Sequence, residues 1–593
     1  MTHETVMVKW GHFMVRWSRP NGFALAFIAL LSARAGAQDV VPSADPASAQ
    51  PPAASATDPA PTADPASAQS PAASATAPAP AKAPKTPPPS NLGLDAVTPR
   101  VVMSVDAPLP KPASIRLDGQ LVFDYMLLSA FDLDDEGTPS DRQSWGHTRA
   151  VLGLDWDALP YMKAVFGAEA FSGTAFGDLS SQGDAVGVHT FSARRNTNFG
   201  VGEFVLREGY LDFDVLVGRL KVGRQGVHWG TGMLVNNGLG DPDFGRAYRG
   251  NISDRIVFGT KPFALTAPYR WMEDLALFVA ADRAVRDDNA SLLRKDETIG
   301  GVFGALVDHR RTKIGFILSY RSQKDRPDGL HPTGERTTVD ALTTDLYFRH
   351  FFNPVKAPKT LFVEGEVALI TGHTDRPYLE ETFVDGADVL SMGGLFRVGY
   401  EDRPNRLFTK LEAGFASGDN DGRDDVARSF RFNSDYRLGL ILFDQVLPLM
   451  TARSADRLTD PGLLGQPPGG LRFTVNQGVV TNAWYLYPFV RYAPIADLEL
   501  RLGYILAHGM ADVVDLFSSG TRAGYNTTVG GQAPGERGLG QEIDASARYT
   551  LAVSDDIALR LGVEGAVYLP GTAFEGVLDD PVTMVRTTMD VRW

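Results

Sequence analysis

The last stretch of the chain, residues 582–593, alternates strictly between two kinds of side chain. One face would carry Val585, Met589 and Trp593 between threonines, whereas the other would carry charged groups such as Arg586. This period of two residues predicts a β-strand with one apolar and one polar face. A membrane-spanning strand has this pattern, with lipid on one side and a wet lumen on the other. The edge strand of a soluble sandwich has it too.

The same alternation recurs along most of the chain after residue 113. Many of these stretches have enough residues to cross a bilayer at a tilt, and aromatic residues gather near their ends, as in interfacial girdles. The expected strands are 115–127, 147–157, 161–173, 205–216, 218–229, 254–262, 274–282, 298–308, 312–322, 340–352, 360–371, 389–401, 406–416, 434–445, 483–493, 497–508, 540–551, 556–568 and 582–593.

The connections between these strands alternate in length. Short links such as 157–161, 308–312 and 493–497 are followed by long polar segments such as 174–204 and 509–539. Short periplasmic turns and long external loops are typical of outer-membrane barrels. The sequence therefore predicts an all-β fold, a transmembrane antiparallel β-barrel over residues 114–593.

The number of strands is expected to be even, because both ends of such a barrel lie in the periplasm. The alternation of loop lengths breaks once, between residues 446 and 482. Either this region hides a twentieth strand, or one of the nineteen stretches is not in the wall and the barrel has eighteen. Residues 430–449 could also fold inward as a constriction. We expect about 18 strands, within a range of 16 to 20.

Two segments precede the barrel. Residues 1–37 combine a basic flank, the apolar run GFALAFIALL and a small-residue site at Ala35-Gly36-Ala37, which predicts a secretory signal peptide. Residues 38–113 are rich in proline and alanine and have little to bury, so we expect a disordered periplasmic tether. Within it, residues 38–99 could contact peptidoglycan or envelope proteins, or serve only as a spacer.

Composition narrows the function. The chain of 593 residues has no cysteine, so it has no disulfide or thiolate chemistry, and its net charge of −14 argues against nucleic acid as a partner. The histidines are scattered, and no nucleophile–base motif, metalloprotease motif or phosphate loop is present. We therefore expect neither an enzyme nor a bound cofactor.

Two neighbouring expected strands in residues 206–232 carry facing charges. Opposite charges on adjacent strands can pair across a lumen and set a transverse field on passing solutes. In strict alternation, Arg224 falls on the face opposite Arg219 and Lys221. The expected pore-lining residues are Arg207, Glu208, Tyr210, Asp212, Arg219, Lys221, Arg224 and Gln225.

The pieces LREGYLD and VGRQGVHWGTG in this region resemble the signature of alginate-export-type and related carbohydrate porins. Residues 413–430, AGFASGDNDGRDDVARSF, resemble a strand and acidic loop of the same family. The resemblance implies a constriction where lumen arginines and lysines face carboxylates. Arg207, Arg219, Lys221 and Arg224 are the matching positions.

The acidic loop that contains Asp419, Asp421 and Asp424 could bind calcium through hard oxygen ligands. It lacks the full EF-hand spacing, and Arg423 interrupts it, so a solvated turn with no metal is the expected state. Trp593 resembles the terminal aromatic signal that the barrel assembly machinery reads.

The combined expectation is a porin-like channel in the bacterial outer membrane for passive diffusion of small polar solutes, such as sugars, organic acids or anions. Two alternatives remain open: a barrel without an open pore that serves as an anchor or recognition platform, and a polysaccharide export channel. Contact with membrane lipid is expected in each case, and a homo-oligomer is compatible with all three.

Overall fold

The protein is described here by a computed structural model that covers residues 114–593, with gaps at 189–203, 265, 267, 328–335, 377–385, 421–423, 465–469, 522–527 and 532–534. The expected signal peptide (1–37) and proline-rich tether (38–113) lie outside the described residues.

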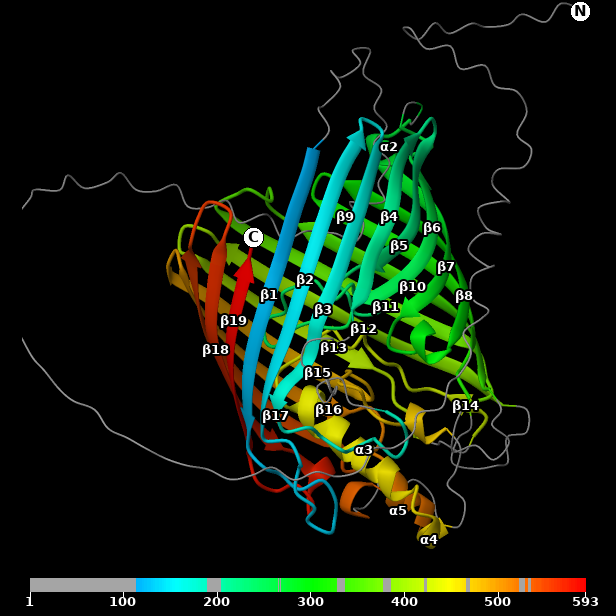
Figure 1. Cartoon of the computed structure of the whole chain (residues 1–593), viewed down its shortest axis with the longest axis vertical. Helices are drawn as coiled ribbons and strands as arrows, with labels where there is room; N and C mark the ends of the chain where they lie inside the picture. Colours follow the sequence, from blue (N-terminus) through cyan, green and yellow to red (C-terminus); the bar gives the residue numbers. More distant parts are fainter. Residues whose placement is uncertain are drawn as a thin grey trace, which may run out of the picture. The chain divides into compact units, whose positions relative to one another are not determined.

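The described chain forms one antiparallel barrel (Figure 1). Its strands are β1 (Ser114–Leu128), β2 (Ser144–Leu159), β3 (Met162–Gly177), β4 (Val205–Val215), β5 (Gly218–Val227), β6 (Asn251–Thr260), β7 (Leu275–Arg286), β8 (Glu297–His309), β9 (Thr312–Lys324), β10 (Thr338–Phe351), β11 (Lys359–Thr374), β12 (Ala387–Asp402), β13 (Leu407–Ala416), β14 (Val426–Ala427), β15 (Ala483–Ile495), β16 (Leu498–Gly509), β17 (Gly538–Ala552), β18 (Ala558–Pro570) and β19 (Val582–Arg592).

The wall contains eighteen of these nineteen strands. The two-residue β14 pairs only in parallel with the end of β12, and β13 pairs directly with β15. Every other strand pairs antiparallel with its neighbours in sequence, and β1 pairs with β19 to close the barrel. The prediction of a closed barrel of about eighteen strands is confirmed.

The connections also alternate as predicted. Short turns lie at one end of the barrel, and long segments with helices α3 (Leu447–Arg457), α4 (Pro461–Leu464) and α5 (Leu516–Thr521) lie at the other (Figure 1). The four-residue α2 (Arg270–Glu273) sits between β6 and β7. Among the described helices, none has the length and apolar character needed to span a membrane.

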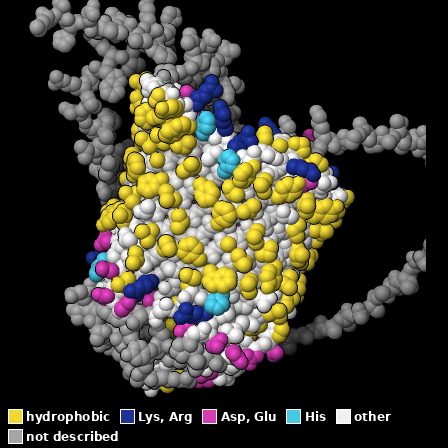
Figure 2. Space-filling view, turned by 180° about the vertical axis from the view of Figure 1, so that it is seen from behind, with side chains coloured by type: hydrophobic (Ala, Val, Ile, Leu, Met, Phe, Trp, Pro, Cys, Tyr) yellow, Lys and Arg dark blue, Asp and Glu magenta, His cyan; other side chains and the backbone are white. Residues whose placement is uncertain are grey.

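The two faces of the wall differ in chemistry because side chains alternate along each strand. In β19, the side chains of Val585 and Met589 are 45% and 40% exposed, whereas Arg586 and Asp590 are 3% and 1% exposed. Apolar side chains spread over the outer surface in the same way (Figure 2). Such a surface suits lipid, and the polar side chains point into the barrel.

One expected strand is not in the wall. Residues 434–445 fold into the interior, where Leu440, Ile441 and Leu442 are at most 2% exposed. The physical reason is that these apolar residues are consecutive. In a wall strand, every second one of them would point into the polar lumen. They join the largest buried apolar cluster and lead through a π-helical turn, Leu442–Val446, into α3. The expected inward fold of 430–449 is thus the arrangement observed.

The terminal residue Trp593 lies at the seam where the barrel closes. Its backbone exchanges hydrogen bonds of 3.1 and 3.0 Å with Gly119 of β1. Its ring covers the site where a side chain on Gly119 would begin. A Cβ at that position would overlap the indole, so a larger residue there would have to displace the Trp593 ring.

Candidate solute pathway in the lumen

The lumen is partly filled by two inward segments. The first, residues 228–250, connects β5 to β6, and it contacts well-separated parts of the wall. Trp229 donates its indole N–H to Asp345 of β10 at 2.6 Å, and Asp243 accepts from Lys410 of β13 at 2.6 Å. Arg246 pairs with Asp124 of β1 at 3.2 Å. This segment therefore extends across the interior of the barrel.

The second inward segment, residues 428–464 and 470–482, packs on the first. The carboxylate of Asp435 accepts hydrogen bonds from the backbone N–H groups of Tyr248 at 2.7 Å and Arg249 at 3.1 Å. The amide N–H of Asn433 donates to the carbonyl oxygen of Met233. Since the contacting stretches of both segments are not in helices or strands, these contacts satisfy backbone groups that would otherwise be buried without partners.

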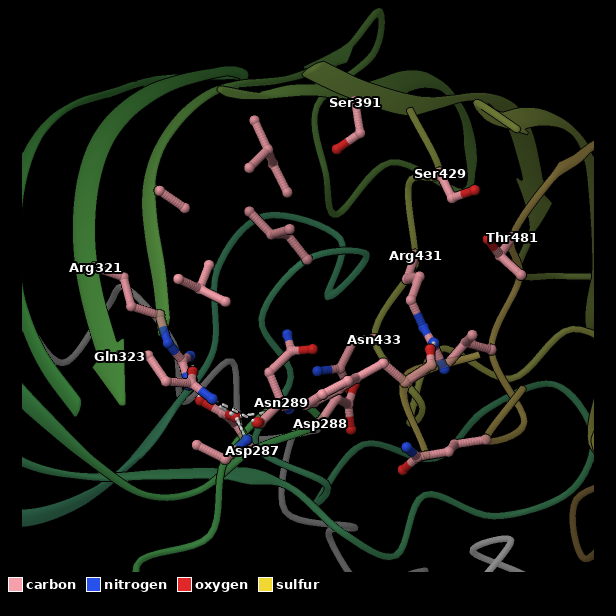
Figure 3. A pocket seen from close by; sticks show the side chains of 18 of the residues that line it. Asp287, Asp288, Asn289, Arg321, Gln323, Ser391, Ser429, Arg431, Asn433 and Thr481 are labelled. Carbon is pink, nitrogen blue, oxygen red and sulfur yellow. Dashed lines mark hydrogen bonds and ion pairs between the residues drawn. The ribbon is translucent and has the colours of Figure 1, made fainter. Parts of the chain in front are cut away.

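A cavity of about 1080 Å³ remains beside the two segments. The inner faces of strands β6 to β12 line one side of this cavity, and the two inward segments line the other side. Figure 3 shows Arg321, Gln323 and Asp287 on one side of the space and Ser391, Ser429, Arg431 and Thr481 on the other.

Several arginines of this cavity are each held by an aspartate. Nitrogen–oxygen distances are 2.6 Å for the Arg321–Asp287 pair and 2.8 Å for the Arg376–Asp325 pair. Arg255 pairs with Asp282 through two hydrogen bonds. Fixed pairs of this kind present strong local dipoles to a solute while adding little net charge.

Arg431 differs from these arginines. Within the described residues, its guanidinium donates to the carbonyl oxygens of Phe473 and Val475, at 3.2 and 3.1 Å, and has no carboxylate within 4 Å. Burial lowers the pKa of Arg431; the charge of Asp288 opposes this shift, and the charges of Arg376 and Arg249 add to it. A cation in this setting attracts an anionic group of a solute.

The predicted pore-lining residues form a separate group on β3 to β5. Asp212 binds Arg219 and lies 3.6 Å from the ammonium of Lys221, which in turn stands 5.3 Å from the centre of the Tyr210 ring. Gln225 donates to the backbone of β6. None of the eight predicted residues lines the 1080 Å³ cavity.

An irregularity in the pairing of β3 with β4 affects two of the predicted residues. The register shifts at Arg207, which allows both Arg207 and the adjacent Glu208 to face inward. Arg207 binds Glu169 and the carbonyl oxygen of Asn237 in the first inward segment. Glu208 lies against Gly167 of β3.

Arg224 lies on the other face of β5. Arg224 pairs with Asp254 of β6 at 2.8 Å. Ser253 and Arg255, on either side of Asp254 in the strand, line the cavity, so Asp254 points to the other face. The structure therefore does not place Arg224 toward the lumen, in line with the strict alternation of the sequence rather than with the family resemblance.

The expected calcium loop is only partly described. Asp421 lies outside the described residues, Asp419 accepts from the backbone of Arg428 at 3.0 Å, and the side chain of Arg428 binds Asp424 at 2.6 Å. Within the described residues, no group of three or more acidic, histidine or cysteine side chains is arranged to hold a metal ion.

Several interior carboxylates were missed at the level of sequence. Glu169, Glu412 and Glu542 are each at most 1% exposed and sit in the middle of wall strands. The single carboxylate of Glu542 accepts three hydrogen bonds, from the backbone N–H groups of residues 440–442. A carboxylate in the middle of a membrane-spanning strand was the available signal, because such a group needs partners inside the barrel.

The chain matches no family model and no curated protein. Among solved structures, it is similar to OccK5 (OpdH) of Pseudomonas aeruginosa, with 10% identity, a TM-score of 0.42, and coverage of 81% of this chain and 98% of that one. OpdK of the same organism, solved with vanillate, has 13% identity, a TM-score of 0.40, and coverage of 80% and 98%. OccAB2 of Acinetobacter baumannii has 10% identity, a TM-score of 0.40, and coverage of 80% and 98%.

Proposed function

We propose that the protein is a porin-like channel in the bacterial outer membrane for passive diffusion of small polar solutes. The observation that carries this proposal is a closed wall of eighteen strands, apolar outside, around a cavity of about 1080 Å³ that is lined by arginine–aspartate pairs as well as apolar side chains. A barrel of this strand number has a lumen wide enough for water and solutes unless loops fill it.

In this proposal, solutes diffuse past fixed charges. The Arg255–Asp282, Arg321–Asp287 and Arg376–Asp325 pairs would orient a polar solute in the cavity. The group formed by Asp212, Arg219 and Lys221 on β4 and β5 would be a second polar station along the inner wall. No conformational cycle and no energy source is required.

The test is single-channel conductance of the refolded protein in a planar bilayer, with reversal potentials in a sodium chloride gradient. Discrete open steps are expected. Asp282→Asn should shift selectivity toward chloride, because it leaves the charge of Arg255 uncompensated in the cavity. Asp254→Asn is the matched control: it removes the same charge from the outer face and should leave the reversal potential unchanged.

A second candidate function rests on the two inward segments. They bury a large apolar cluster inside the barrel, which is the arrangement expected of an occluded anchor or recognition platform. A correctly folded barrel without conductance would favour this candidate and contradict the channel.

The finer proposal of an alginate-export-type channel is supported by the motifs in residues 206–232 and 413–430. Block of an open channel by an anionic polysaccharide added on one side would favour export. Equal conductance with and without the polymer would exclude it.

A further inference from the structure

Three buried side chains near the start of β2 have polar nitrogens without partners. They are Arg142 Nε and Nη1, Trp145 Nε1 and His147 Nδ1, none of which has a hydrogen-bond partner in the described part of the chain. The residues are 0%, 1% and 5% exposed. Leaving such groups unsatisfied in the interior costs free energy, so several together are unusual.

These nitrogens belong to one cluster. The Arg142 guanidinium carbon lies 4.0 Å from the centre of the Trp145 ring, and Arg142 Nη2 donates to Thr174 of β3 at 3.1 Å. Thr174 is the residue that faces His147 in the β2–β3 pairing. The ring of Tyr248 packs against the ring of His147, and the two ring centres are 4.3 Å apart.

The nearest acidic residues are engaged elsewhere. Asp141 accepts from the backbone N–H and the hydroxyl of Ser181 at 2.7 and 2.9 Å. Asp178 accepts from the backbone of residues 143 and 144 at 3.0 and 2.7 Å. Asp141 and Asp178 act on Arg142 as nearby charges, but no described carboxylate forms a hydrogen bond or ion pair with it, and a buried ion without a direct partner is strongly destabilising.

The charges around the cluster increase the positive potential. His147 faces Arg142, Arg149 and Arg586, with Asp124 as the acidic group on that side. The carboxylate of Asp124 is already bound by Arg246 and Arg586, and Glu169 is bound by Arg149 and Arg207. Asp124 is thus shared by two arginines and Glu169 by three, and no described carboxylate forms an ion pair with Arg142.

We propose that Arg142, Trp145 and His147 form a binding site for a small halide-sized anion, chloride under cellular conditions. An anion of this size accepts hydrogen bonds from several directions and needs no planar or bidentate geometry. Arg142, Trp145 and His147 line neither the 1080 Å³ cavity nor the smaller cavity beside Trp593, so the proposed site is separate from the solute pathway. The ion supplies the counter-charge and the hydrogen-bond acceptor that the protein lacks there.

The direct test is anomalous diffraction from crystals of the full-length protein grown with bromide in place of chloride. A bromide peak within hydrogen-bonding distance of Arg142 and Trp145 is the expected result. A water molecule at that position with no anomalous signal would overturn the proposal.

A solution test uses the coupling between ion binding and stability. The thermal midpoint of the protein should rise as chloride replaces gluconate at constant ionic strength, because a ligand of the folded state stabilises it. Trp145→Phe keeps the ring beneath Arg142 but removes the indole N–H, and should weaken chloride binding about tenfold. Trp156→Phe, on the outward face of the same strand, is the control and should retain the full chloride response.

If Trp145→Phe and Trp156→Phe responded equally to chloride, the site would be refuted. Arg142→Gln provides a second variant that should abolish the response. Arg116→Gln, at an arginine whose side chain is 71% exposed, controls for the loss of a positive charge.

Discussion

The carboxylate of Glu542 provides the clearest test of what holds the second inward segment in the lumen. It accepts from the backbone N–H groups of Leu440, Ile441 and Leu442 at 2.6, 2.8 and 2.8 Å. Glu542→Gln keeps the shape, but it removes the charge and turns one acceptor oxygen into an amide donor that faces an N–H group.

The magnitude follows from these contacts. A hydrogen bond to a charged group contributes about 1.5–3 kcal/mol, so losing one and weakening two should destabilise the seated segment by roughly 3 kcal/mol. At 1.4 kcal/mol per factor of ten, the open fraction should increase by about 100-fold. The wall should remain folded, because its strand pairing does not depend on these three groups.

The assay uses the absence of native cysteine. Val446, which is 0% exposed, is replaced by cysteine, a change of similar volume. The rate of labelling by a water-soluble thiol reagent then reports opening of the segment when closing is fast relative to labelling. Labelling should become about 100-fold faster with Glu542→Gln and stay unchanged with Glu536→Gln, an exposed residue before the same strand. Equal labelling rates in the two backgrounds would refute the role of Glu542.

Three further predictions concern the seam, the cavity and the acid response. Gly119→Val should reduce the yield of folded barrel, because its side chain would occupy the volume of the Trp593 ring; folding is read from the heat-dependent shift on a gel, and normal yield would contradict the packing argument. Arg431→Gln should lower the chloride-to-sodium permeability ratio about tenfold, because one charge acting at about 6 Å through water changes the permeability of each ion about threefold and in opposite directions; an unchanged reversal potential would place Arg431 off the ion path. Burial alone would raise the pKa of Asp325, but hydrogen bonds and charge from Arg376 outweigh it and lower the pKa. Because the folded pKa is below the unfolded value of about 3.9, this stability is present above that pH and is lost as the pH falls further, so the thermal midpoint of wild type should drop more steeply below pH 4 than that of Arg376→Gln. Parallel pH profiles for the two proteins would contradict this assignment.

The wall could be predicted from the sequence because lipid and lumen impose opposite chemistry on alternate residues. The residues of β19 show this directly: Val585 and Met589 face out, and Arg586 and Asp590 face in. Strand ends were predicted less well, since β2 and β3 each extend to sixteen residues, beyond the stretches that alternate clearly.

The interior was predicted only in part, for a physical reason. Periodicity reports which face a side chain takes, but it does not report which loop residue meets it. The Asp212–Arg219 pair was accessible because its two strands are joined by a short turn. The contacts of Arg246 with Asp124 and of Glu542 with residues 440–442 join positions at least 100 residues apart. The register shift at Arg207 was equally invisible, because a bulge leaves no period of its own.

The contacts that hold the inward segments in place also determine which charged groups are left to select solutes. Segments of irregular backbone inside a barrel need acceptors for their N–H groups, and here carboxylates supply them: Glu366 binds Thr231, Asp435 binds residues 248–250, and Glu542 binds residues 440–442. These carboxylates serve the structure and are shielded by it. Although the chain has a net charge of −14, many of its interior acidic groups are therefore not available to a passing ion. Charge selectivity should then depend on the few groups whose charge is not compensated, and this is why Arg431 is expected to shift the reversal potential although it is one arginine among many.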